Sequence, residues 1–164
     1  MRDAQSKQVA MAHARRMAHP EPQRPRVLLA DDDPEVRGML AAVLRQDGMD
    51  VIEARDGIEL LELIADEILA EREKPGIDLV VSDIRMPGRT GLNALANLRR
   101  DDWATPVLLI TAFGDRQTDQ EADRLGAIGV FHKPFDLDDF RTAVLNVVGP
   151  VARREPSGHG AYAS

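Results

Sequence analysis

The feature that most limits how this chain can fold is a series of short, largely apolar runs, each followed directly by polar residues. The runs are residues 27–30, 79–82, 107–110 and 130–132, and the residues that follow them are Asp31, Asp32 and Asp33, then Asp83, Thr111 and Lys133. Short runs without regular polar alternation are typical of strands that are buried on both faces. Because the carboxyl ends of parallel strands meet at the ligand crevice of an open sheet, we expect these polar side chains to converge.

Helix signals separate the predicted strands, so strand and helix alternate five times along the chain. The predicted strands are residues 27–30, 49–54, 77–82, 105–110 and 128–132, and the predicted helices are residues 34–47, 57–74, 91–100, 115–125 and 136–148. Parallel strands joined by right-handed helical crossovers form a three-layer, doubly wound α/β sandwich. The sequence therefore predicts this fold class, with a five-stranded parallel sheet and five helices.

Capping residues and apolar spacing support the individual helices. Asp33 is the expected N-cap of the first helix, with Pro34 at its first position. The predicted inward stripes are Val36, Met39, Leu40, Val43 and Leu44 in the first helix, and Leu60, Leu61, Ile64, Ile68 and Leu69 in the second. The helix over residues 115–125 differs, since its only apolar members are Ala122 and Leu125. Little packing is expected to hold that helix.

Composition divides the chain into a folded centre and two flanking segments. We expect residues 1–25 to form a flexible basic arm with a proline-rich linker, residues 26–149 to form the domain, and residues 150–164 to be a disordered tail. The net charge is −7, although residues 1–26 hold six Arg or Lys against two acids, so the domain itself is acidic. An acidic domain repels a phosphate backbone, which argues against direct binding of nucleic acid.

The sequence lacks cysteine, transmembrane and signal-peptide features, which disfavours several classes of protein and cellular locations. It contains no cysteine, so it offers neither a disulfide framework nor a thiolate metal site. No apolar run approaches the roughly 18 residues that a transmembrane helix requires, and the N-terminus has no apolar segment typical of a signal peptide. We expect a cytoplasmic protein without a membrane partner.

Four segments together carry a resemblance to a known family. They are residues 29–34 (LADDDP), 81–88 (VSDIRMPG), 110–112 (ITA) and 132–135 (HKPF). In this order, each beside a predicted strand, they resemble the receiver domain of two-component response regulators, which has the flavodoxin-like architecture with sheet order 2-1-3-4-5. The resemblance covers roughly residues 26–148.

The resemblance implies particular roles for several residues. Asp83 would accept a phosphoryl group from a histidine of a sensor kinase or phosphotransfer protein. The backbone carbonyl of Arg85, two residues after the acceptor, would complete the coordination of a metal ion. The Lys133–Pro134 peptide would be cis, which in this family directs the lysine inward.

The chemistry of the residues supports these roles independently. Asp31, Asp32 and Asp83 form an acidic cluster of the oxygen ligands that Mg²⁺ prefers. A bound cation would offset the repulsion between a carboxylate and an incoming phosphoryl group. We expect Asp32 and Asp83 to be direct ligands and Asp31 to act through water. Lys133 and Thr111 would offer a positive charge and a hydroxyl to the phosphoryl oxygens.

Two features depart from the family pattern. Many receivers have an aromatic residue on the fifth strand three positions before the lysine, where Val130 stands here. Phe131 is adjacent, but strand alternation points it to the opposite face of the sheet. The second helix is also predicted to be about two turns longer than usual. Arg85 and Phe113 are expected to flank the mouth of the site and to control the access of hydrolytic water.

Other functions stay open at this point. A phosphatase that forms an aspartyl-phosphate intermediate commonly has a second acid two residues after its nucleophile, but Arg85 stands there. A phosphorylation-independent pseudo-receiver that only binds partners is a second alternative. A nucleotide-binding flavodoxin-like protein is a third, although no glycine-rich phosphate loop follows a predicted strand.

For the receiver interpretation, we expect no enzymatic turnover beyond self-phosphorylation and autodephosphorylation. The weakly packed helix favours a switching surface formed by residues 115–125, 128–132 and 136–148, and homodimerisation through that surface stays open. His132 is expected to be structural or exposed rather than a general base. The kinase, the signal and the downstream protein target are not specified by the sequence.

Overall fold

Strands and helices alternate through the domain in the predicted order. The fold is that of a computed structural model in which residues 4–8, 24–70, 76–86, 90–101, 103–112 and 114–149 are described. The strands are β1 (Arg26–Ala30), β2 (Asp50–Ala54), β3 (Leu79–Asp83), β4 (Val107–Thr111) and β5 (Gly129–His132). The helices are α2 (Pro34–Gln46), α3 (Gly57–Leu69), α4 (Gly91–Arg100), α5 (Arg116–Arg124) and α6 (Leu137–Val148).

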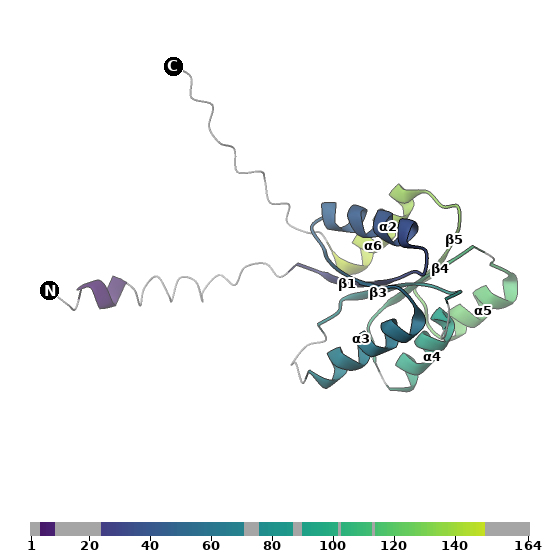
Figure 1. The fold of residues 1–164 in the computed structure, drawn as a ribbon, viewed down its shortest axis with the longest axis horizontal. Coiled ribbons are helices and arrows are strands. Elements are labelled where there is room, and N and C mark those ends of the chain that lie inside the picture. Colours follow the sequence, from purple (N-terminus) through teal and green to yellow (C-terminus); the bar gives the residue numbers. More distant parts are fainter. Residues whose placement is uncertain are drawn as a thin grey trace, which may run out of the picture.

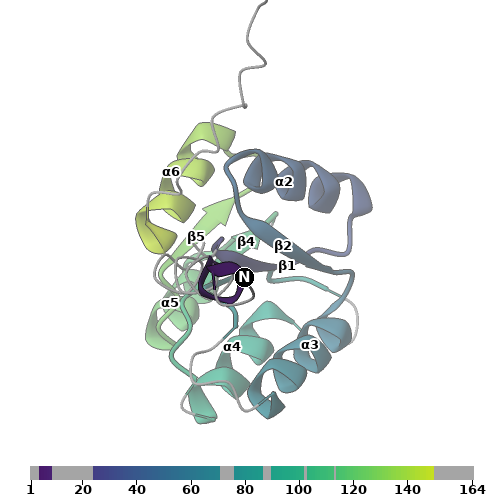
Figure 2. The ribbon, with the colours of Figure 1, turned by 90° about the vertical axis from the view of Figure 1, so that its left-hand side faces the viewer.

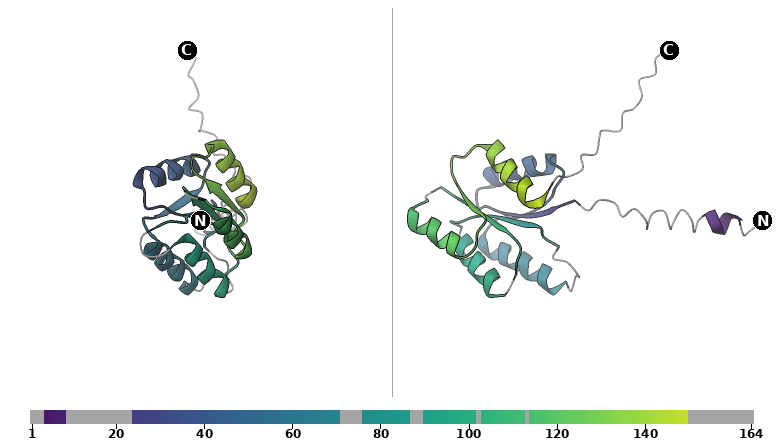
Figure 3. Two further views of the ribbon diagram at one scale, coloured as in Figure 1. Left: turned by 90° about the vertical axis from the view of Figure 1, so that its right-hand side faces the viewer. Right: turned by 180° about the vertical axis from the view of Figure 1, so that it is seen from behind.

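The strands form one parallel sheet between two layers of helices. Their order is β2-β1-β3-β4-β5, and every neighbouring pair is parallel. Helices α2 and α6 cover one face of the sheet, while α3, α4 and α5 cover the other (Figures 1 and 2). The same two layers are visible from behind in Figure 3. The predicted doubly wound sandwich and its strand order are confirmed, and residues 4–8 are helical in addition to the five helices of the domain.

Two apolar cores, one on each face of the sheet, hold these layers together. Alternate residues of a strand enter different cores: Leu29 and Val81 pack toward α2 and α6, whereas Leu28 and Val80 pack toward α3, α4 and α5. Every residue of β3 and β4 is buried. This burial on both faces explains why the central strands have continuous apolar runs rather than polar alternation.

The register of the sheet brings the carboxyl ends of the strands to a common edge. Ala30 pairs with Ser82, Asp83 with Ile110, and Thr111 with His132. Asp83 and Thr111 are therefore the last residues of their own strands instead of the first loop residues. The edge where the sequence predicts a site is shared by β1, β3, β4 and β5.

Side-chain caps begin each helix of the domain close to this edge. The N-caps are Asp33, Asp56, Thr90, Asp115 and Asp136. The Oδ1 atom of Asp33 accepts hydrogen bonds from the N–H groups of Glu35 at 2.9 Å and Val36 at 3.3 Å. Asp33 is thus a helix cap, as predicted, and its carboxylate is committed to the start of α2.

The inward stripes of two helices differ from the prediction. Met39 is 45% exposed because the buried stripe of α2 is centred on Leu40, Ala41 and Leu44, which turns position 39 toward solvent. In α3, Ile68 and Leu69 are 45% and 76% exposed. The first residue of β1, Arg26, forms an ion pair with Glu67 at 3.0 Å, so the last turn of α3 lies near the amino end of the strand.

Other expectations concern segments that are only partly described. Helix α3 ends at Leu69, with Ala70 as its C-cap, and its predicted continuation over residues 71–74 lies outside the described residues. Phe113, most of the basic arm and the tail over residues 150–164 also lie outside them. Among the described residues, no helix is both long and apolar enough to cross a membrane.

Candidate functional site

Three carboxylates lie together at the carboxyl edge of the sheet. Oxygen atoms of Asp31, Asp32 and Asp83 all lie within 4.8 Å of one another. Asp31 is 1% exposed and Asp83 is 6% exposed, whereas Asp32 is open to solvent. The cluster is therefore a partly buried group of negative charge that solvent reaches through Asp32. The structure brings the three predicted acids together.

Lys133 enters the same cluster from β5. Its Nζ donates to Asp83 Oδ2 at 2.9 Å and to Asp31 Oδ2 at 3.1 Å. Its backbone N–H donates to the carbonyl of Thr111 at 2.7 Å, which ties the lysine to the end of β4. The Lys133–Pro134 peptide is cis, as predicted. One ammonium group thus bridges two carboxylates, one directly after β1 and one at the end of β3.

The protonation equilibria of this cluster reflect competition between burial and charge. Burial raises the pKa of Asp31, and the nearby Asp83 carboxylate raises it further, while hydrogen bonds from Asp33 N–H and Lys133 oppose the rise. For Lys133, burial lowers the pKa, but the hydrogen bonds and charges of the two carboxylates outweigh it, so the pKa is raised. The charged form of the lysine is therefore favoured, whereas burial disfavours the charged form of Asp31.

Backbone groups fix the orientation of both buried carboxylates. Asp33 N–H donates to Asp31 Oδ1 at 2.9 Å, and Arg85 N–H donates to Asp83 Oδ1 at 3.0 Å. Each aspartate thus has one oxygen held by the following loop and one held by Lys133. This leaves little rotational freedom at either side chain.

Gly91 allows the start of α4 to approach the site closely. A Cβ atom added at this position would lie 2.5 Å from the carbonyl oxygen of Asp83 and 3.1 Å from Ser82 Oγ. Gly91 N–H also donates to the carbonyl of Ile84 at 2.9 Å. Sequence reasoning missed this residue, although a glycine at the first position of a helix is a signal of close backbone approach.

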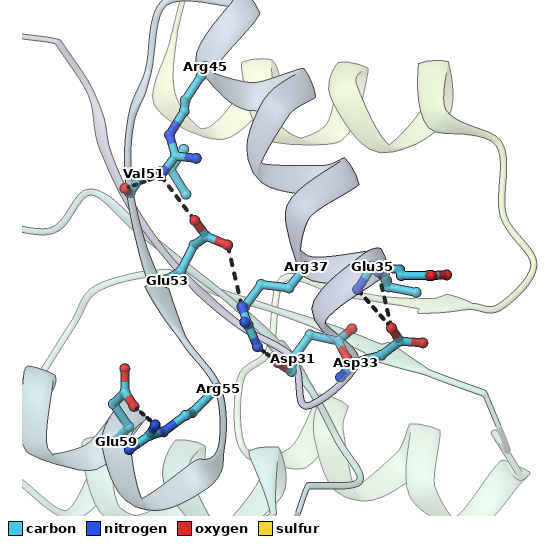
Figure 4. A network of polar contacts seen from close by, with 10 residues as sticks. Asp31, Asp33, Glu35, Arg37, Arg45, Val51, Glu53, Arg55 and Glu59 are labelled. Carbon is cyan, nitrogen blue, oxygen red and sulfur yellow. Dashed lines mark hydrogen bonds and ion pairs between the residues drawn. The ribbon is translucent and has the colours of Figure 1, made fainter.

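An arginine of α2 supports the loop that carries the acidic pair. Arg37 Nη1 donates to the backbone carbonyl of Asp31 at 2.9 Å, and its Nε donates to Glu53 Oε1 at 3.3 Å. Arg45 donates to the other oxygen of Glu53 at 3.2 Å. Figure 4 shows this network running from α2 across β2 to Asp31. It holds the Asp31 backbone from behind the site, and no sequence motif indicated it.

The other predicted residues lie around the cluster. Thr111 is fully buried at the end of β4. Arg85 is exposed, and its positive charge adds to the hydrogen bonds from Thr118 that lower the pKa of Asp115, the N-cap of α5. The Arg85 charge therefore lies near enough to the start of α5 to act on Asp115. Its predicted neighbour at the mouth, Phe113, lies outside the described residues.

This fold and this set of strand-end residues define a receiver domain, and sequence comparison gives the same class. Residues 27–145 match the family described as the response regulator receiver domain, so the chain belongs to that family. It is similar to sporulation initiation phosphotransferase F of Bacillus subtilis, with 33% identity over 73% of this chain and 90% of that protein.

Longer relatives share the domain. Regulatory protein AtoC of Escherichia coli is 39% identical over 73% of this chain, and transcriptional regulatory protein PdtaR of Mycobacterium tuberculosis is 38% identical over 73%. The match spans 24% and 54% of those two proteins. Among solved structures, the receiver domain of the Francisella response regulator 1452 matches with a TM-score of 0.66 and 28% identity, covering 76% of this chain and 97% of that chain.

Proposed function

We propose that this chain is a phospho-accepting receiver of a two-component phosphorelay, with Asp83 as the acceptor. The observation that carries the proposal is the bridge from Lys133 to both Asp83 and Asp31 inside the acidic cluster. An isolated surface aspartate has no such partner. Here the acceptor carboxylate lies at an edge of the sheet that solvent reaches, and the ammonium group of Lys133 lies beside it. This positive charge suits reaction with an anionic phosphoryl group.

The donor set of the site fits Mg²⁺. Receiver domains bind this ion at an acidic site, and three carboxylates against one ammonium leave a net negative charge that a divalent cation would balance. Asp32 and Asp83 would hold the ion directly, Asp31 through water, and the carbonyl of Arg85 would complete the set. When bound, Mg²⁺ supplies electrostatic screening between the acceptor carboxylate and the phosphoryl oxygens.

The chain's own residues then account for the transfer step. A carboxylate oxygen of Asp83 forms a bond to phosphorus while the phosphorus–nitrogen bond of the donor phosphohistidine breaks. The electron pair of that bond returns to the donor imidazole, which takes up a proton. Lys133 stays protonated throughout and offers its charge to a phosphoryl oxygen, and the Thr111 hydroxyl donates to another. The partner supplying the phosphoryl group is a sensor kinase or a phosphotransfer protein.

Release of the phosphoryl group needs a water molecule at the same mouth. Arg85 is two residues after the acceptor, and its charge acts on Asp115 at the N-terminus of α5. With Phe113, it would flank the approach of hydrolytic water, and the two side chains would set the rate of autodephosphorylation by obstructing or admitting that water. Measured dephosphorylation rates of Arg85→Ala and Phe113→Ala that both equal the wild-type rate would remove this part of the proposal.

The output surface that best fits the packing is formed by α5, β5 and α6. Only Ala122 is buried in α5, so this helix can rearrange at low cost. The surface would contact a downstream protein or a second copy of the chain. The domain itself would span residues 26–149, in keeping with the family match over residues 27–145. Residues 1–25 and 150–164 would be flanking segments.

The proposal is tested by labelling with small phosphoryl donors in the presence of Mg²⁺. Acetyl phosphate supplies an acyl phosphate, and phosphoramidate supplies the phosphorus–nitrogen bond of a phosphohistidine. Intact-mass measurement should show one added phosphoryl group on the wild type, which hydroxylamine then removes. Asp83→Asn should add none, while Asp66→Asn, which changes an exposed aspartate on α3, should label as the wild type does.

Two results would decide against this function. Equal labelling of the wild type and Asp83→Asn would show that another group accepts the phosphoryl group. Steady hydrolysis of p-nitrophenyl phosphate by the wild type, lost in Asp83→Asn, would indicate a phosphatase instead.

A further inference from the structure

A polar contact joins β5 to α5 directly beside the site. The Nε2 atom of His132 lies 3.1 Å from Oδ2 of Asp119. A carboxylate can only accept, so the imidazole donates this hydrogen bond. Both side chains are about half exposed, at 47% and 45%. His132 immediately precedes Lys133, and Asp119 lies in the first turn of α5.

The imidazole also rests against the loop that follows Thr111. A Cβ atom added to Gly114 would overlap the Cε1 and Nδ1 atoms of His132, and it would lie 3.1 Å from the methyl carbon of Thr111. Gly114 is therefore packed between the site threonine and the histidine ring. His132 and Thr111 are also partners in the register of β4 and β5. The loop at Gly114 thus lies close to both the threonine and the imidazole.

Alternation along β5 places this ring on the side of the sheet that carries α5. Val130 belongs to the core beneath α3, α4 and α5, whereas Phe131 packs with Phe135 and Phe140 on the side of α6. Residue 132 shares the face of residue 130 because strand side chains repeat every second position. Val130 is aliphatic and cannot donate a hydrogen bond, so His132 is the residue of β5 that offers α5 a polar contact.

Helix α5 depends on polar contacts more than the other helices do. Its buried side chain is that of Ala122, and Arg99 holds its C-terminal end by donating to the carbonyls of Leu125 and Gly126, each at 3.1 Å. The contact between His132 and Asp119 holds its first turn. Oδ1 of Asp119 is buried without a hydrogen-bond partner among the described residues, so this tether includes an unsatisfied oxygen.

From these contacts we propose that His132 is a positioning residue: together with Asp119 it latches the first turn of α5 and links that turn to Thr111 through Gly114. This inference rests on the proposed function, because it describes how a phosphoryl group on Asp83 is reported at α5. Movement of Thr111 toward the phosphoryl group shifts Gly114 and the imidazole, and the hydrogen bond to Asp119 is lost.

The test compares amide hydrogen exchange in α5 for six proteins. They are the wild type, His132→Ala, His132→Gln, Asp119→Ala, the double variant His132→Ala/Asp119→Ala and the control Asp123→Ala. A glutamine amide reaches about as far as Nε2 and donates in its place, so His132→Gln should keep the latch. Asp123 is exposed one turn further along α5, so Asp123→Ala makes the same change in helix propensity as Asp119→Ala without touching His132.

Without phosphoryl donor, His132→Ala and Asp119→Ala should speed exchange of the first-turn amides of α5 about 2- to 10-fold, the loss of one hydrogen bond. The double variant should exchange no faster than either single variant. His132→Gln and Asp123→Ala should match the wild type. After labelling of Asp83, exchange in α5 should rise in the wild type but change little in His132→Ala, which is already unlatched.

Other outcomes would overturn the latch. These are wild-type exchange in unlabelled His132→Ala, equal effects of Asp119→Ala and Asp123→Ala, or additive effects in the double variant. Labelling of Asp83 is measured in parallel on every variant and should be retained. If the wild type does not label, the proposed function fails, while the unlabelled comparisons still decide whether the latch exists.

Discussion

Helices α2 and α5 flank the same site and are held in opposite ways. Helix α2 buries Leu40, Ala41 and Leu44 on the sheet, and its Arg37 donates to the backbone of Asp31. Helix α5 buries Ala122, its C-cap Leu125 is half-buried, and polar contacts hold both of its ends. The loop with Asp31 and Asp32, which would hold a cation, is therefore next to a well-packed helix. Thr111 and Lys133, which would contact the phosphoryl group, lie beside a helix that can move at low cost.

This difference would suit two separate roles within one site: binding a cation and changing conformation. A cation site needs fixed ligands, because displaced carboxylates lose their geometry together with their affinity. A signalling surface needs two arrangements of similar free energy. Under the proposed function, the buried apolar residues of α2 would keep the cation site fixed, and their scarcity in α5 would let the signalling surface rearrange.

The largest expected effect is a difference between α2 and α5 in the stability lost when an apolar side chain is truncated. Leu44→Ala removes a fully buried side chain of α2 and should lower the free energy of unfolding by about 2–5 kcal/mol. Leu125→Ala, at the half-buried C-cap of α5, should cost roughly 1 kcal/mol, because less apolar surface is lost. Urea titration followed by the fluorescence of the single tryptophan, Trp103, measures both. Equal losses would remove the contrast in packing.

A second test concerns the close approach of α4. Gly91→Ala places a methyl group against the carbonyl of Asp83, so the start of α4 must shift, at a cost of roughly 1–3 kcal/mol. Because the shift occurs at the acceptor, Asp83 should also label more slowly with acetyl phosphate. Gly38→Ala is the matched control, since a Cβ there meets nothing within 4 Å. Wild-type stability and labelling in Gly91→Ala would show that the contact is not needed.

A third test uses the raised pKa of Asp31. A carboxyl group whose folded pKa lies above its unfolded value of 3.8 favours the folded state below pH 3.8, and this contribution is lost as pH rises through the folded pKa. Above the folded pKa, the ionised form of Asp31 therefore lowers stability. Asp31→Asn should stabilise the metal-free protein at pH 7, on the order of 1 kcal/mol, and the gain should shrink in acid. Thermal unfolding at both pH values checks the sign.

The smallest expected effects on thermal stability come from two ion pairs, one beside α2 and one on α5. Arg141 of α6 donates twice to Asp47 after α2, at 2.9 and 2.7 Å, and the Asp47 side chain is 9% exposed. Arg124 pairs with Glu121 on the open surface of α5. Arg141→Ala should lower Tm measurably, whereas Arg124→Ala should leave Tm almost unchanged, because exposed pairs contribute little. A larger drop for Arg124→Ala would reverse the expected order.

Much of this architecture could be predicted from the sequence, for identifiable reasons. The runs of β3 and β4 are buried on both faces, so their composition alone indicates strands. Asp33 followed by Pro34 fixes the start of α2, and Asp31, Asp83 and Lys133 converge because parallel strands end at one edge. The cis peptide before Pro134 was predicted only through the family resemblance.

The predictions from sequence are wrong or incomplete where contacts between helices and strands determine which side chains are buried or paired. Met39 has an apolar side chain at helical spacing, but the orientation of α2 on the sheet turns it outward. Ile68 and Leu69 continue the stripe of α3, but in the last turn of the helix both are exposed. The contact between His132 and Asp119 joins positions 13 residues apart through the packing of α5 on β5, and no local pattern indicates it.

The most direct test of the central claim records amide hydrogen exchange in α2 and α5 before and after Asp83 is labelled with acetyl phosphate and Mg²⁺. Labelling confirmed by mass should raise exchange in α5 and leave the buried amides of α2 unchanged. Asp83→Asn, treated identically, should show no change in either helix. Equal changes in α2 and α5, or unchanged α5 in fully labelled protein, would contradict the division between a fixed cation site and a movable reporting helix.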